Sequence, residues 1–208
     1  MIHTVKAALL AAALSLTGFA AVAQETTAPA APPVEVTDMS IGNPDAPVKI
    51  IEYASFTCPH CANFHEAAFK PLKAEYIDTG KVYFTLREVY FDRYGLWAAM
   101  MARCGGEMKY FGVTDILYST QKEWSASDDA NVVVGNLKKI ALGAGMDGAA
   151  VDACMKDGTM AQALVTRFES NMAADKVEGT PTLFINGARQ GNMAYAELKA
   201  LIDAELAK

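Results

Sequence analysis

Two cysteines, Cys58 and Cys61, are the residues of this sequence whose type and spacing most directly suggest chemistry. Only Pro59 and His60 separate them. Two thiols at this spacing can form a redox-active disulfide, supply half of a zinc site, or make a structural bridge. A zinc site needs four ligands, and the sequence contains no second close pair of cysteines or histidines. The pattern therefore favours a redox-active dithiol and no metal.

The two cysteines lie where a predicted strand is followed by a predicted helix. Residues 48–54 form a short run of apolar and β-branched side chains between turn residues, which is typical of a buried strand. Over residues 59–78 apolar side chains recur four positions apart, which indicates a helix. Pro71 lies inside this segment, and we expect it to bend the helix rather than end it.

The start of that helix should make the two thiols chemically different. Unpaired N–H groups and the helix dipole favour a thiolate, so we expect a lowered pKa for Cys58. Pro59 suits the first helical position, and His60 adds a polar neighbour. Cys61 lies one turn further into the helix and should be more buried and less ionised. Cys58 is therefore predicted to be the reactive sulfur and Cys61 the resolving sulfur.

Further strands are expected on both sides of a long helical region. Residues 36–40 and 82–87 predict two strands, and a βαβ connection would make the second parallel to 48–54. Near the C-terminus, Asn186-Gly187 predicts a two-residue hairpin between strands at 182–185 and 188–190.

The region between the two groups of strands has helical character. Separate helices are predicted over 95–104, 108–120, 128–143, 148–155 and 159–174, and a last one over 195–206. We therefore predict an α/β domain formed by residues 35–93 and 176–208. Residues 94–175 are predicted to form an inserted helical subdomain.

The first 23 residues have the pattern of a secretory signal peptide. Lys6 precedes the apolar run 7–21, and Ala21-Val22-Ala23 is a small-residue cleavage pattern. Residues 24–34, rich in Ala, Thr and Pro, are predicted to be a flexible leader. Export would place all four cysteines in an oxidising compartment, where disulfides persist. The formal net charge of −6 argues against nucleic acid as a partner.

Two more cysteines, Cys104 and Cys154, lie in the predicted helical subdomain. Four cysteines allow three pairings, and the close spacing of Cys58 and Cys61 favours pairing of these two. Cys104 and Cys154 would then form a second, structural disulfide, which an oxidising compartment favours. The alternative is a pair of buried free thiols.

A proline motif and a histidine complete the set of candidate residues. Thr180-Pro181 directly precedes the predicted strand 182–185. Proline here is usually a turn residue, but a cis peptide bond would place the Thr180 backbone beside the sulfurs, ready to pair with an extended peptide. His65 follows Cys61 by about one helical turn, and we expect it to be exposed to solvent.

The order of these motifs resembles that of the thioredoxin-like superfamily, and more narrowly that of the DsbA-like periplasmic thiol:disulfide oxidoreductases. The resemblance covers roughly residues 36–206. It rests on the Cys-Pro-His-Cys motif after a strand containing Glu52, the helical insertion, Gly-Thr-Pro-Thr, a strand and Asn-Gly. It implies a thioredoxin-like fold, with a mixed sheet flanked by helices and an inserted helical subdomain.

The resemblance also implies roles for individual residues. Pro59-His60 would stabilise the Cys58 thiolate, and a stable thiolate makes the disulfide a stronger oxidant. Pro181 would be cis and border a substrate groove. Glu52 would be a buried carboxylate that assists proton transfer near Cys61. Some relatives pair this carboxylate with a buried lysine, for which the candidate cations here are Lys49, Lys81 and Arg87.

We therefore predict an exported, periplasmic oxidase that donates the Cys58–Cys61 disulfide to reduced secreted or periplasmic proteins. The disulfide itself would be the only redox group, without a further cofactor. The resemblance implies a membrane partner of the DsbB type that reoxidises the dithiol, and we expect a monomer. The alternatives are a disulfide isomerase or reductase of the same fold and, from another class, a non-catalytic metal- or peptide-binding module.

Overall fold

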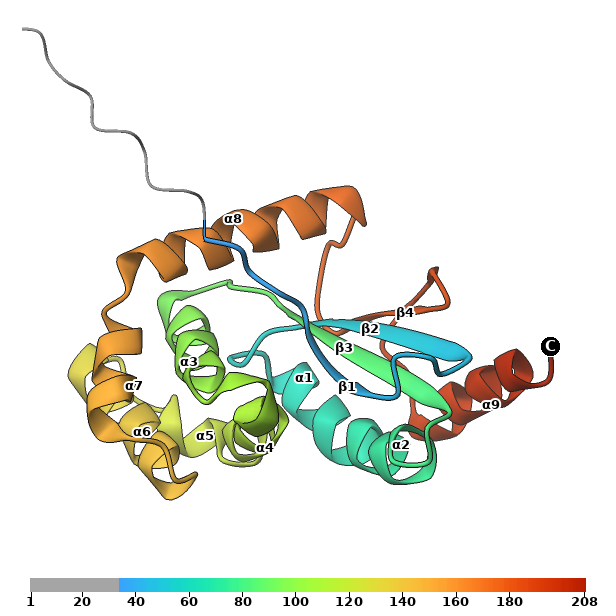
Figure 1. Cartoon of the computed structure of the whole chain (residues 1–208), viewed down its shortest axis with the longest axis horizontal. Coiled ribbons are helices and arrows are strands. Elements are labelled where there is room, and N and C mark those ends of the chain that lie inside the picture. The colour runs from blue at the N-terminus through green and yellow to red at the C-terminus, as the bar shows by residue number, and fades with distance from the viewer. Residues whose placement is uncertain (1–33) are drawn as a thin grey trace, which may run out of the picture. The chain divides into compact units, whose positions relative to one another are not determined.

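The fold is organised around a five-stranded mixed sheet, and the computed structural model describes residues 34–208 of the chain (Figure 1). The predicted signal peptide and all of the predicted leader except Val34 lie outside the described residues. The strands are β1 (Met39–Gly42), β2 (Val48–Ala54), β3 (Val82–Glu88), β4 (Thr182–Ile185) and β5 (Ala188–Gln190). Their order is β1-β3-β2-β4-β5; β2 and β3 are parallel, and the other neighbours are antiparallel. The predicted βαβ connection is therefore confirmed.

The first strand begins later than predicted. A strand over 36–40 was expected, whereas β1 begins at Met39, which pairs with Leu86 of β3. Immediately before it, Asp38 accepts hydrogen bonds from Arg87 and Arg167. Arg87 belongs to β3, so Asp38 still contacts this strand through its side chain, while the backbone pairing starts one residue later, at Met39.

One long helical run follows β2 and carries the two cysteines at its start. It consists of α1 (Pro59–Phe64), η1 (His65–Phe69), α2 (Lys70–Leu72) and η2 (Lys73–Ile77), where η marks π-helical turns. Pro71 has no N–H to donate, yet the run continues through it, as predicted. The π-helical turns on either side of Pro71 keep the backbone hydrogen-bonded. Lys70 N–H donates to the His65 carbonyl, and Asp78 N–H donates to the Lys73 carbonyl.

Six helices occupy the chain between β3 and β4. They are α3 (Arg93–Cys104), α4 (Gly106–Ser119), α5 (Gln121–Trp124), α6 (Ala130–Gly143), α7 (Gly148–Met155) and α8 (Gly158–Ala174). Four of them begin after an aspartate whose carboxylate accepts a backbone N–H bond, at Asp92, Asp129, Asp147 and Asp157. The short α5 was not predicted, because four residues are too few to show helical periodicity. The last helix, α9 (Tyr195–Leu206), has the predicted bounds.

The two faces of the sheet are covered by different helices (Figure 1). Ile50 and Ala54 of β2 face the main core, which also contains side chains of α1 and α9. Tyr53 faces the opposite side, where Phe168 and Met172 of α8 pack near it. Because neighbouring residues of a strand point to opposite faces, Glu52 lies on the same face as Ile50 and Ala54. This is the face that carries α1 and its cysteines.

The hairpin between β4 and β5 forms as predicted. Asn186 and Gly187 both have positive φ values, 46° and 83°, which a type I′ turn requires. Within residues 34–208, no helix combines the length and the apolar character needed to cross a membrane.

Candidate active site

Cys58 lies at the N-terminal cap of α1, with extended backbone angles, and Pro59 occupies the first turn. The Cys58 carbonyl accepts the first helical hydrogen bonds, from the N–H groups of Cys61 at 3.1 Å and Ala62 at 3.2 Å. Both thiols are free; Cys58 is half-buried and Cys61 is fully buried. The local sequence therefore places one accessible and one inaccessible sulfur within a single helical turn.

The surroundings of Cys58 favour its thiolate. A hydrogen bond from the Cys61 thiol lowers the pKa of Cys58 to about 5, against the opposing effect of partial burial. The backbone groups of Cys61 and His60 add to this lowering. Cys58 Sγ also lies 3.7 Å from the Thr180 carbonyl oxygen, and Thr180-Pro181 is a cis peptide bond. The structure thus brings the two motifs together, although Cys58 and Thr180 lie 122 positions apart in the sequence.

Cys61 has the opposite tendency. Burial, its hydrogen bond to Cys58 and the nearby Glu52 carboxylate all raise the pKa of Cys61 well above that of a free thiol. The two sulfurs therefore differ in ionisation as well as in exposure. Pro59 and His60 are both exposed, and His60 acts on Cys58 through its backbone.

Glu52 is buried, with 3 % of its surface exposed. Burial, followed by the nearby Cys58 charge, raises the pKa of Glu52 to about 8. A carboxyl group with this pKa is mostly protonated at neutral pH, and it lies on the face of β2 that packs against α1. Such a group can exchange a proton near Cys61.

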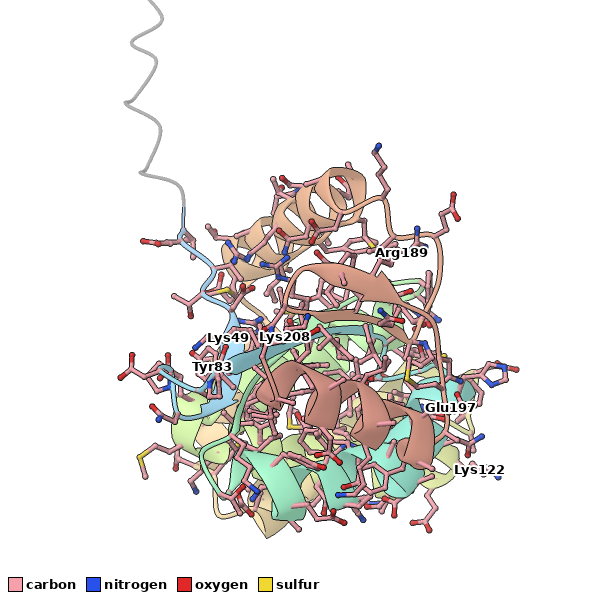
Figure 2. The ribbon with its side chains drawn as sticks, turned by 90° about the vertical axis from the view of Figure 1, so that its right-hand side faces the viewer. Lys49, Tyr83, Lys122, Arg189, Glu197 and Lys208 are labelled. Carbon is pink, nitrogen blue, oxygen red and sulfur yellow. A yellow bond between two sulfur atoms is a disulfide. The ribbon has the colours of Figure 1, made fainter. Side chains whose placement is uncertain are left out.

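None of the three candidate cations forms an ion pair with Glu52 in the described part of the chain. The Lys49 ammonium lies over the Tyr83 ring, 5.1 Å from its centroid. Figure 2 shows Lys49 and Tyr83 side by side, on the opposite side of the view from Lys122. Lys81 lies over Tyr76, and Arg87 binds Asp38 and Asp175. The Glu52 carboxyl group is therefore held protonated by burial rather than ionised by a partner.

The expectation for His65 was wrong. His65 is 3 % exposed; its Nε2 lies 3.0 Å from Asp115 Oδ1, and its ring packs against Phe69 and Tyr118. His65 lies four positions after Cys61, so both lie on the helix face that α4 covers. Burial lowers the pKa of His65, while Asp115 opposes the shift.

His65, Glu66 and Asp115 also form a cluster whose ligand atoms lie within 4.8 Å of one another. The Lys70 ammonium already lies 2.8 Å from Glu66 and 3.2 Å from Asp115. Lys70 thus pairs with both carboxylates of the cluster, which forms an ion-pair network.

Residues from the helical region between β3 and β4 also form hydrogen bonds with residues 55–58, the cysteine loop that joins β2 to α1. Sequence reasoning missed these residues. Thr57 Oγ1 donates to Asp92 Oδ2 at 2.6 Å, at the start of α3. The buried Gln121 side chain donates to the carbonyls of Phe56 and Cys58. Gln121 lies more than sixty residues from the loop, in a helix too short to predict. No local signal in the sequence could have found it.

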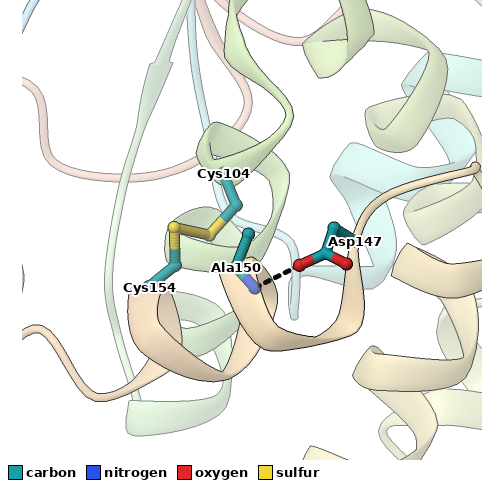
Figure 3. The surroundings of a disulfide bond; sticks show 4 residues. All are labelled: Cys104, Asp147, Ala150 and Cys154. Carbon is teal, nitrogen blue, oxygen red and sulfur yellow. Dashed lines mark hydrogen bonds between the residues drawn. A yellow bond between two sulfur atoms is a disulfide. The ribbon is translucent and has the colours of Figure 1, made fainter.

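Cys104 and Cys154 are joined by a disulfide that ties the end of α3 to α7 (Figure 3). Their Cα atoms lie 6.0 Å apart, and the bridge closes a separation of 50 residues. In the same view the Asp147 carboxylate accepts the Ala150 N–H at 2.8 Å, which caps α7. Cys104 is the last residue of α3, and Cys154 lies near the C-terminal end of α7.

Replacing Cys104 and Cys154 together by alanine should lower the free energy of unfolding by about 4 kcal/mol, because the unfolded chain regains the entropy of an open loop of 50 residues. Urea unfolding monitored by circular dichroism measures this loss. Thiol titration of a Cys58→Ser/Cys61→Ser variant is the complementary test. Two reactive thiols in that variant, purified without reductant, would contradict the bridge.

The fold and the site define a class: a thioredoxin-fold protein with a dithiol of unequal thiols at a helix start and a cis-proline loop beside it. A family model described as Thioredoxin matches residues 34–204. The chain belongs to this family.

Curated relatives and solved structures agree with the resemblance. The chain is 32% identical over 171 residues to a Rickettsia bellii protein provisionally named a protein-disulfide oxidoreductase, covering 82% of this chain and 65% of that one. It is 31% identical to a Bacillus anthracis protein provisionally named disulfide bond formation protein D, covering 83% and 80%. The crystal structure of Wolbachia pipientis alpha-DsbA1 superposes with a TM-score of 0.76 at 27% identity, covering 84% and 94%. The predicted DsbA-like relationship and thioredoxin-like fold are confirmed.

Proposed function

We propose that this chain is a DsbA-type protein thiol:disulfide oxidoreductase that acts as an oxidase. The observation that carries the proposal is the opposite perturbation of Cys58 and Cys61. A Cys58 thiolate with a pKa of about 5 stabilises the reduced protein. Stabilising the reduced form makes the corresponding disulfide a strong oxidant, which is readily donated to other thiols.

In the proposed reaction a substrate thiolate attacks Cys58 Sγ of the oxidised protein. The bond between Cys58 and Cys61 breaks, a mixed disulfide forms, and Cys61 leaves as a thiolate. Because the pKa of Cys61 is raised, this thiolate takes up a proton, for which the protonated Glu52 is the proposed donor. The two electrons come from the substrate, which ends as a disulfide, while Cys58 and Cys61 end reduced.

The second step resolves the mixed disulfide. Another thiolate of the substrate attacks the substrate sulfur, and Cys58 departs as a thiolate. A leaving thiol with a low pKa departs faster, so the environment of Cys58 accelerates this step. We assign Thr180 and Pro181 to substrate binding, because the Thr180 carbonyl lies beside Cys58, where an extended peptide can pair with the backbone.

The wider setting is also proposed. The signal-peptide pattern over residues 1–23 supports export, which would make reduced secreted or periplasmic proteins the substrates. A membrane partner of the DsbB type would reoxidise the dithiol. We propose a monomer in the periplasm whose only redox group is its own disulfide.

Equilibration with glutathione tests the direction of the reaction. We expect a reduction potential for Cys58–Cys61 near the value of about −120 mV that is typical of DsbA. Quantifying the two thiols at defined ratios of reduced to oxidised glutathione gives this potential. A potential near the value of about −270 mV of thioredoxin would instead indicate a reductase and contradict the oxidase.

A further inference from the structure

The cysteine loop receives two hydrogen bonds from a single buried side chain of the helical region. Gln121, the first residue of α5, is 6 % exposed. Its Nε2 donates to the Phe56 carbonyl at 2.8 Å and to the Cys58 carbonyl at 3.0 Å. One amide group thus holds two peptide units of this loop, Phe56–Thr57 and Cys58–Pro59.

These two carbonyls determine how the chain enters α1. The Cys58 carbonyl also accepts the first helical bonds, from Cys61 and Ala62. The Phe56 carbonyl lies between the end of β2 and the start of α1, outside both elements. Cys58 N–H bonds to the Ser55 carbonyl at 3.1 Å, so Gln121 and this turn together define the backbone of Cys58.

We propose that Gln121 is a positioning residue for the dithiol, which holds Cys58 at the start of α1 and beside Thr180. The inference rests on the proposed function for its place in the reaction. The Gln121 amide donates to the carbonyls of the loop and not to either sulfur. The helical region thereby sets the geometry in which the N–H groups of α1 and the Cys61 thiol stabilise the Cys58 thiolate.

A structural role alone would give a different result. If Gln121 only satisfied two buried carbonyls, its loss would destabilise the chain without changing the ionisation of Cys58. The titratable groups near Cys58 are Cys61, His60, Glu52 and Tyr118. None of them is altered by a substitution at residue 121, so a change in Cys58 ionisation reports on its position.

The test is the pH dependence of Cys58 alkylation by iodoacetamide in the reduced, full-length chain. In wild type the rate should follow the thiolate, with a midpoint at about pH 5. In Gln121→Met, which has a similar volume but no donor, we expect the midpoint to rise by about one unit. Alkylation at pH 5 would then be about fivefold slower, and the glutathione equilibrium, measured at about pH 7, would shift about tenfold toward the disulfide.

Gln162→Met is the matched control, because it removes an exposed amide of α8 and should leave the midpoint unchanged. An unshifted midpoint in a folded Gln121→Met chain would overturn the proposal. Should that variant fail to fold, wild-type NMR decides. The Gln121 side-chain ¹⁵N resonance of the reduced protein should move with the ionisation of Cys58 and stay constant in Cys58→Ser. A resonance that does not move with this ionisation overturns the proposal.

The proposed function can fail separately from this inference. Alkylation and NMR follow the ionisation of Cys58, which reports on its position whether or not the protein oxidises a peptide. If the wild-type protein does not oxidise a dithiol peptide, the proposed oxidase function is wrong. A shifted alkylation midpoint in Gln121→Met would still support the positioning role.

Discussion

Replacing Cys58 by serine is expected to reduce oxidation of a reduced dithiol peptide to the rate seen in buffer alone. A serine oxygen can neither form the disulfide with Cys61 nor accept a substrate sulfur, so both steps of the exchange are lost. Loss of free peptide thiols over time, measured by chromatography, gives the rate. The expected effect is the largest of any single change, because Cys58 is the half-buried sulfur and Cys61 is fully buried.

Two matched variants show whether the loss is specific. Cys61→Ser keeps the Cys58 sulfur, so it should still form a mixed disulfide with a peptide disulfide but should not resolve it. The double variant Cys104→Ala/Cys154→Ala keeps both redox sulfurs and should retain the wild-type rate. Wild-type activity in Cys58→Ser would show that this sulfur is not the one that substrates attack.

Replacing Glu52 by glutamine is expected to stabilise the reduced chain by about 5 kcal/mol at pH 9 and to have almost no effect at pH 4. Burial raises the pKa of Glu52 from 4.5 to about 8. A group with a raised pKa contributes its full stability below its unfolded pKa, and this contribution is lost as pH rises through the folded value. Wild type therefore loses stability between about pH 4.5 and pH 8, and an uncharged amide does not. Urea unfolding at several pH values measures the difference.

The control for this effect is Glu169→Gln, which neutralises an exposed carboxylate of α8 and should give a curve parallel to wild type. The gain from Glu52→Gln should be smaller in the oxidised chain, because the Cys58 thiolate contributes to the raised pKa of Glu52. A difference between Glu52→Gln and wild type that does not change with pH would show that Glu52 is not buried as a protonated acid.

Local features of the chain were predictable because they depend on neighbours in sequence. The β-branched run before Cys58, the four-residue apolar spacing after it and the turn residues Asn186-Gly187 each act within a few positions. The bounds of α7 and α9 agree with the prediction for the same reason. The start of β1 differs from the prediction, because the point where backbone pairing begins depends on β3, a distant segment whose Leu86 pairs with Met39.

The surroundings of the site were harder to predict from the sequence, because burial and long-range contacts create them. His65 is polar, and only the cover provided by α4 makes it a buried partner of Asp115. No pattern linked Lys49, Lys81 or Arg87 to Glu52, and the structure gives each of these cations a different neighbour.

That a dithiol lies at a helix start follows from the sequence, because strand, helix and Cys-Pro-His-Cys spacing are all local. The same local pattern predicts that Cys58 ionises more readily than Cys61, and the tertiary structure adds the burial and the long-range contacts of the two thiols. It buries Cys61, leaves Cys58 half-exposed and brings Thr180 to 3.7 Å from the Cys58 sulfur. It also places the Gln121 amide against the loop, from a helix far along the chain. Ionisation depends on desolvation and on hydrogen-bond donors. Neighbours in sequence supply most of the donors to Cys58, whereas desolvation arises only when distant segments pack together.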